Sequence, residues 1–175
     1  VAMCVNALSA LASAFTILFL FWTITALAKK LVQPDTLWKG IALLGAGAVG
    51  ALAYTFSDTF WFSAVEGEVY ASSSLFTAVV FWLILKWDEQ ADEEGSDRWL
   101  IAIAYLMGLS IGVHLLNLLT IPAIGLVYYF RKYEFSWKGL IYAFLASCAV
   151  LLVILYGIIP GVPTLIGWFE LMFVN

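Results

Sequence analysis

Three carboxylates stand among aromatic residues in the stretch FSDTFWFSAVEGEVY, which runs from Phe56 to Tyr70. They belong to Asp58, Glu66 and Glu68. A positioned carboxylate can take the proton of an attacking hydroxyl group, and ionisable groups at membrane depth are costly enough to suggest a function. These acids are therefore candidate catalytic or substrate-binding groups. Hydration at the level of lipid headgroups is the alternative interpretation.

The single histidine and a nearby amide lie in the stretch GVHLLNLLTIP. His114 and Asn117 could donate hydrogen bonds to a substrate beside the carboxylates. The alternative is a hydrogen bond between helices that fixes this short segment, although such bonds contribute only about 0.6 kcal/mol on average. Both interpretations remain open from the sequence.

A helix that begins near Ser57 and continues to Lys86 would position the acids. Ser57 or either of the two residues after it can cap its start. On such a helix Glu66 and Glu68 are separated by about 200°, so at most one of them would contact a substrate. Glu66 would share a helix face with Tyr70, four residues later, and could hydrogen-bond to it.

The composition indicates that most of this chain lies in a lipid membrane. Apolar residues make up 64% of it and charged residues 11%, whereas soluble domains have roughly 45–50% and about 25%. Several apolar runs reach the roughly 18 residues that mark a candidate membrane-spanning helix. We predict an all-α fold, a polytopic transmembrane helical bundle that forms a single domain over residues 1–175. Six membrane segments are predicted, at 4–28, 38–56, 69–86, 99–114, 117–130 and 139–159.

The basic residues predict the orientation of these segments. All of them fall in the connections 29–39, 86–98 and 131–138. Because cytoplasmic loops are enriched in Lys and Arg, these connections should be cytoplasmic, and the acids near Glu68 and the tail after Pro160 should face away. The net charge of −4, without a clustered basic face, argues against a nucleic-acid partner.

Counting residues from the basic side predicts the depth of the candidate site. Glu68 is 18 residues from Lys86, about 27 Å of helix, and His114 is 16 residues from Arg98, about 24 Å. The two should therefore lie at similar depth. Residues 99–130 allow only two short legs, so we expect a broken hairpin there, surrounded by protein or by a water-filled cavity.

Small residues and cysteines have structural interpretations. The stretch GAGAVGA, residues 45–51, offers small faces that let another helix approach closely. Cys4 and Cys148 lie in apolar runs without metal-ligand spacing, which predicts neither a disulfide nor a metal site. A divalent cation held by Asp58 or a glutamate together with a lipid phosphate remains an open alternative.

Two stretches together resemble a known family. SDTFWFSAVEGEVYASSSLFTAVVFWLILKW and GLSIGVHLLNLLTIPA are similar to protein O-mannosyltransferase-like membrane proteins, which resemble C-type glycosyltransferases, and the resemblance extends over nearly the whole chain. Its most specific parts are Phe60-Trp61 followed by Glu68-Val69-Tyr70, and then Gly112-x-His114 before Pro122. Gly67 stands where Ala is commoner.

The resemblance implies an enzyme with an all-α C-type glycosyltransferase fold. It would move a sugar such as mannose from a polyprenyl-phosphate carrier in the lipid bilayer to Ser or Thr hydroxyls of an acceptor protein. We expect it in a bacterial inner membrane, with the site facing the periplasm. The expected catalytic residues are Glu68 and Asp58, and the expected substrate-binding residues are Glu66, Tyr70, His114 and Asn117.

The sequence departs from the family pattern where the main catalytic base is expected. Such enzymes place their main catalytic acid in a first external loop after an initial helix, and the resemblance implies that this chain begins beyond that loop. We therefore expect a fragment of a longer chain, with the main base outside it. A membrane transporter and a non-catalytic membrane subunit are the alternatives, because broken hairpins also build transport sites and small-residue faces also pack against partners.

Overall fold

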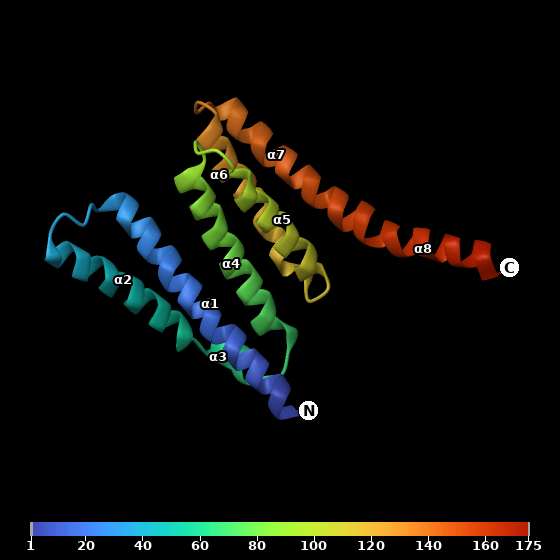
Figure 1. Cartoon of the computed structure of the whole chain (residues 1–175), viewed down its shortest axis with the longest axis horizontal. Helices are drawn as coiled ribbons and strands as arrows, with labels where there is room; N and C mark the ends of the chain where they lie inside the picture. Colours follow the sequence, from blue (N-terminus) through green and yellow to red (C-terminus); the bar gives the residue numbers. More distant parts are fainter. Residues whose placement is uncertain (1, 175) are drawn as a thin grey trace. The chain divides into compact units, whose positions relative to one another are not determined.

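The computed structural model describes residues 2–174, and within them every regular element is helical (Figure 1). These residues form two compact units, which divide between Asn117 and Leu118. The helices of the first unit are α1 (Ala2–Leu31), α2 (Leu37–Thr55), α3 (Asp58–Val65), α4 (Val69–Gln90) and α5 (Asp97–Ile111). A 3-10 helix, Leu115–Thr120, contains the division. The second unit holds α6 (Ile121–Lys132), α7 (Trp137–Val153) and α8 (Ile159–Val174), with a π-helix, Ile154–Ile158, between the last two.

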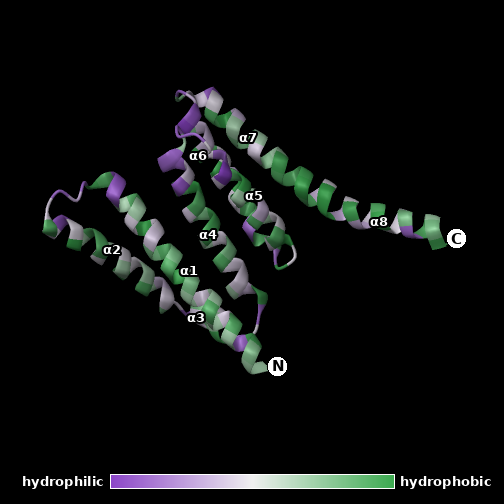
Figure 2. Ribbon diagram, in the orientation of Figure 1, coloured by the Kyte–Doolittle hydropathy of each residue, from purple (hydrophilic) through white to green (hydrophobic). Residues whose placement is uncertain are grey.

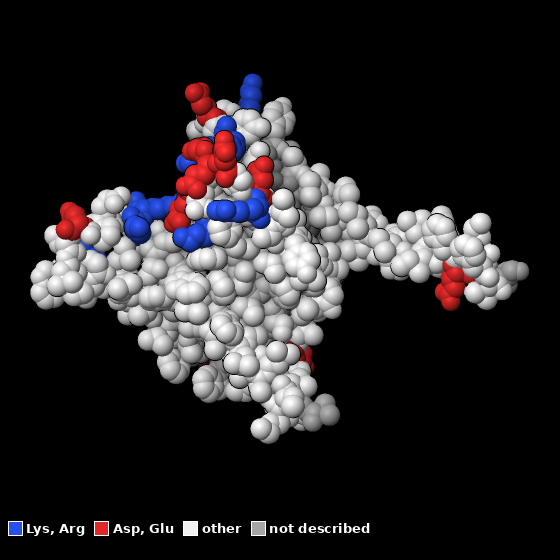
Figure 3. Space-filling model, viewed as in Figure 1, with Lys and Arg blue, Asp and Glu red and all other residues white. Residues whose placement is uncertain are grey.

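The first unit is built around α1, which packs against α2, α3 and α4, while α5 packs against α4. The neighbouring helices α1 and α4 run in the same direction, and α2 and α5 run opposite to them, so α1 and α4 end where α2 and α5 begin (Figure 1). Lys and Arg of this unit gather at that end (Figure 3). An ion pair between Lys30 and Asp88 joins α1 to α4 there. Lys and Arg of this unit therefore lie at the end opposite to the α3–α4 linker, as predicted, although the acids of the α4–α5 connection share that end (Figure 3).

Four stretches are long and apolar enough to cross a membrane: Ala2–Leu31, Leu37–Thr55, Val69–Gln90 and Trp137–Val174. Their middles are apolar, and hydrophilic residues concentrate at the α1–α2 and α4–α5 connections (Figure 2). The two legs of the predicted hairpin form shorter helices, α5 with 15 residues and α6 with 12. The structure thus confirms a helical membrane protein in which these two helices are short.

Small residues of α2 let it approach α1 closely, as predicted. Gly47 and Ala51 are buried on one face of α2. A Cβ atom at Gly47 would lie 2.5 Å from the Thr25 methyl carbon and 3.1 Å from the Phe21 ring. The Thr25 hydroxyl donates to the Phe21 and Trp22 carbonyls, so its methyl group cannot turn away without breaking those bonds.

Replacing Gly47 with Ala is expected to destabilise the α1–α2 contact by about 1–3 kcal/mol, because the new methyl group overpacks it. Gly45→Ala is the matched control, since a Cβ atom there meets nothing within 4 Å. Ala also has the higher helix propensity, so the control should be neutral or slightly stabilising. Unfolding of both variants in detergent measures the difference, and equal stability would contradict the close packing.

In the second unit, a buried tyrosine closes the turn between α6 and α7. The Tyr129 hydroxyl accepts a 2.9 Å hydrogen bond from the Ser136 backbone N–H. It lies 3.2 Å from the Glu134 carbonyl oxygen and 3.1 Å from the Ser136 carbonyl oxygen, to which it can donate. Ser136 caps α7 in turn, because its side chain accepts from the Gly139 N–H.

Tyr129→Phe is expected to destabilise this turn by about 0.5–1.5 kcal/mol, because the part-buried Ser136 N–H loses its acceptor. Tyr133→Phe is the control: Tyr133 stacks on Tyr129 but its side chain is 63% exposed. Thermal unfolding of the two variants should separate them, and a Tyr133→Phe loss as large as that of Tyr129→Phe would rule out the hydroxyl as the cause.

The helix that contains the last predicted membrane segment, 139–159, continues to Val174. Proline lacks an N–H group, and its ring crowds the carbonyl four residues earlier. Here the turn before Pro160 widens into the π-helix, in which the Ile159 N–H bonds to the Ile154 carbonyl. The widened turn accommodates Pro160 without ending the helix, so the residues after it do not form an extended tail.

Candidate functional site

The acidic linker between α3 and α4 is the first part of the candidate site. Glu66 directly follows α3 with φ −85° and ψ 139°, and Glu68 directly precedes α4 with φ −109° and ψ 165°. Both have extended backbone, so the predicted continuous helix from Ser57 to Lys86 is wrong, and the 200° separation of the two carboxylates does not apply. The predicted helical pairing of Glu66 with Tyr70 fails for the same reason.

The carboxylates of this region are accessible. The side chains of Asp58, Glu66 and Glu68 are exposed, and none of them takes part in a hydrogen bond or ion pair within residues 2–174. The Glu68 side chain does not bond to the first-turn N–H groups of α4. Its oxygens are therefore available to other molecules.

Gly67 lets this linker pass close to the start of α1. A Cβ atom on Gly67 would lie 2.9 Å from a Val5 methyl carbon and 3.0 Å from the Asn6 side-chain oxygen. Both atoms end side chains that can rotate, so the commoner Ala of the family is compatible with this packing. Asn6 is a neighbour of the site that the sequence interpretation missed, although an amide within the apolar run 4–28 was a usable signal.

Two aromatic rings join α4 to the turn after α5. Tyr70, in the first turn of α4, and His114 have ring centroids 5.5 Å apart. The contact agrees with the predicted similar depth of His114 and the start of α4. The His114 Nδ1 atom accepts a 3.1 Å hydrogen bond from the Leu116 N–H. In the neutral imidazole, Nε2 therefore carries the proton and can donate it to another molecule.

Asn117 lies beneath this turn, with no exposed surface. Its side-chain NH₂ group donates a 3.1 Å hydrogen bond to the Ser110 hydroxyl, which donates to the Met107 carbonyl at 2.7 Å. This chain of bonds ties the residues after α5 back to its last turn. The geometry favours the alternative in which Asn117 fixes the fold, and its role in substrate binding stays a prediction.

Asp58 stands apart from the Tyr70–His114 contact at the start of α3. Two residues later, Phe60 is buried, and its ring lies 4.6 Å from that of Tyr54, which packs the start of α3 against the end of α2. No contact given by the structure brings Asp58 to Tyr70 or His114. The structure thus brings together Tyr70 and His114, places Glu68 two residues before Tyr70, and leaves the catalytic role of Asp58 untested.

An apolar groove of about 390 Å³ runs along α1, α4 and α5 beside the site. On α4 it extends from Ser72, in the first turn, to Val79, and Ser72 lies about 200° around the helix from Tyr70. Its lining residues are Leu8, Leu11, Ala12, Phe15, Ser72, Leu75, Phe76, Val79 and Leu106. The apolar lining of this groove suits a hydrocarbon chain whose polar end lies at the first turn of α4.

The site offers few metal ligands. Within residues 2–174, no group of three or more His, Cys, Asp or Glu side chains is arranged to hold a metal ion. A divalent cation here would have to take further ligands from a substrate phosphate. Cys4 and Cys148 are both free thiols.

The chain was compared with known proteins. No curated protein and no solved structure matches it. A family profile described as the protein O-mannosyl-transferase TMEM260 N-terminal domain matches residues 1–137, which contain all of the predicted site residues. Because the match covers more than half of the sequence, the chain belongs to this protein O-mannosyltransferase family.

Proposed function

We propose that this chain forms part of a membrane glycosyltransferase that moves mannose or a similar sugar from a polyprenyl-phosphate carrier to Ser or Thr hydroxyls of proteins. The family match over residues 1–137 is the observation that carries this proposal. The exposed carboxylates, the Tyr70–His114 contact and the adjacent apolar groove support it.

The proposed reaction needs a base for the acceptor hydroxyl and donors for the leaving phosphate. The hydroxyl oxygen forms a bond to the anomeric carbon of the sugar while its proton passes to a carboxylate. The bond between that carbon and the phosphate oxygen breaks, and the phosphate keeps the electron pair. Preorganised hydrogen-bond donors stabilise that charge.

We assign these roles to the residues at the start of α4. Glu68 is the proposed proton acceptor, because its carboxylate is exposed and has no partner within residues 2–174. Asp58 is a further candidate acid, and Glu66 a candidate contact for the acceptor. His114 Nε2–H, the Tyr70 hydroxyl and the first N–H groups of α4 are the proposed phosphate donors, since helix N-termini favour anions.

The carrier and the membrane orientation follow from the same arrangement. We place the polyprenyl chain in the apolar groove, with its phosphate at the first turn of α4. The basic end of the first unit is assigned to the cytoplasmic side by the positive-inside rule. The acidic linker then faces the opposite side, which is the periplasm if the chain belongs to a bacterial inner membrane.

Transfer in proteoliposomes tests the proposal. The protein is reconstituted with polyprenyl-phosphate mannose and a Ser/Thr peptide, and mass spectrometry measures sugar on the peptide. Transfer should occur from the lipid-linked donor and not from nucleotide-linked mannose. Passage of free sugar across the membrane without any transfer would contradict the proposal and favour a transporter.

A further inference from the structure

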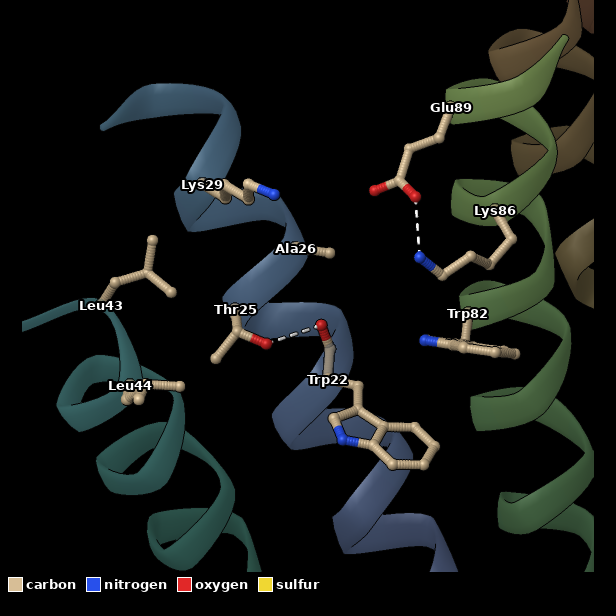
Figure 4. Close-up of a pocket in the computed structure, with 9 residues that line it drawn as sticks. All are labelled: Trp22, Thr25, Ala26, Lys29, Leu43, Leu44, Trp82, Lys86 and Glu89. Atoms are coloured by element: carbon tan, nitrogen blue, oxygen red, sulfur yellow. Dashed lines mark hydrogen bonds and ion pairs between the residues drawn. The ribbon is translucent and has the colours of Figure 1, made fainter. Parts of the chain in front are cut away.

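A second pocket, of about 460 Å³, opens at the basic end of the first unit between α1, α2 and α4 (Figure 4). Its deeper part is aromatic. The rings of Trp22 on α1 and Trp82 on α4 lie 5.6 Å apart, and Phe19 contacts both of them. This end is opposite to the acidic linker, and neither the family match nor the proposed reaction assigns it a role.

Charged side chains form the upper part of the pocket. Lys86 pairs with Glu89 at 2.7 Å, and its ammonium group lies 5.6 Å from the Trp82 ring centroid. Lys29 reaches into the same space from α1 (Figure 4), and it makes no hydrogen bond or ion pair within residues 2–174. Two lysines and one glutamate leave the pocket with one net positive charge.

The pocket has charged residues at one level and aromatic residues at another, as a phospholipid has a charged headgroup and apolar acyl chains. Lys29 lies seven residues after Trp22, about 10 Å along α1, and Lys86 lies four residues after Trp82, about 6 Å along α4. Cations therefore stand above the indole rings. Tryptophan favours the membrane interface, and lysines beside membrane helices attract anionic lipids.

We propose that this pocket binds an anionic phospholipid from the surrounding leaflet. The phosphate lies between Lys29 and Lys86, and the first part of an acyl chain packs on Trp22 and Trp82. The single surplus positive charge matches the single negative charge of a phosphatidylglycerol headgroup. A zwitterionic headgroup matches it less well, because it brings its own ammonium group.

Native mass spectrometry of the whole chain tests this, with an equimolar mixture of phosphatidylglycerol and phosphatidylcholine that carry identical acyl chains. Phosphatidylglycerol adducts should predominate. Lys29→Gln and Lys86→Gln should each lower the preference about fivefold. Lys39→Gln is the control, because Lys39 pairs with Asp35 outside the pocket, and it should leave the preference unchanged.

Glu89→Gln separates a binding defect from a folding defect. It removes the one carboxylate among the described lining residues and frees Lys86, so the preference for phosphatidylglycerol should rise. Equal adducts of the two lipids in the unmodified protein would overturn the proposal, as would a loss of preference in Lys39→Gln equal to that in Lys29→Gln. Displacement of the lipid by millimolar inorganic phosphate would identify a free-phosphate site instead and would also overturn it.

Discussion

Replacing Glu68 with Gln is expected to lower the rate of sugar transfer by about a hundredfold to ten-thousandfold, because Gln cannot accept the proton of the acceptor hydroxyl. Gln has nearly the same size, and the Glu68 side chain neither caps α4 nor pairs with another residue within residues 2–174. The stability of the variant should therefore equal that of the parent. Transfer in proteoliposomes and thermal unfolding in detergent measure the two quantities.

Two substitutions of the same kind make this result specific. Glu94→Gln changes an exposed carboxylate in the connection between α4 and α5, at the opposite end of the first unit, and should leave transfer unchanged. Glu66→Gln changes the other acid of the linker and should have a smaller effect than Glu68→Gln. If Glu68→Gln transfers sugar as fast as Glu94→Gln, Glu68 is not the base.

The acidic linker shows where the sequence was insufficient. Apolar runs located the membrane helices because hydrocarbon burial requires long uninterrupted stretches, and the start of α4 at Val69 matched the predicted segment. The break before it was missed because no proline marks it. Only Gly67, whose absent side chain lets the linker pass Val5 and Asn6, indicates the break, and that contact joins residues about sixty positions apart.

The position of His114 shows what helix geometry alone can predict. Counting residues at a constant rise placed it near the start of α4, and its ring does contact that of Tyr70. The hydrogen bond from Asn117 to Ser110 could not be predicted in this way. Ser110 is a small residue in an apolar run, and only the fold after α5 brings it close to Asn117.

The helix beyond Pro160 was missed because a π-helix can accommodate a proline, which the sequence pattern alone indicates as the end of a helix.

Replacing His114 with Asn is expected to lower sugar transfer roughly a hundredfold while the turn after α5 stays intact. The His114 Nδ1 atom accepts the Leu116 N–H, two residues later. An Asn side-chain oxygen makes the same contact in an Asx-turn, so the local fold keeps its hydrogen bond. Asn has no group at the position of Nε2–H, and the donor proposed for the leaving phosphate is lost.

His114→Ala completes the comparison because it removes both the acceptor and the donor. It should lose transfer as His114→Asn does, and in addition it should unfold at a lower temperature, since the Leu116 N–H loses its partner. If His114→Asn transfers sugar at the parent rate and only His114→Ala is impaired, the histidine serves to hold the turn. The phosphate would then have to be stabilised by Tyr70 and the first N–H groups of α4.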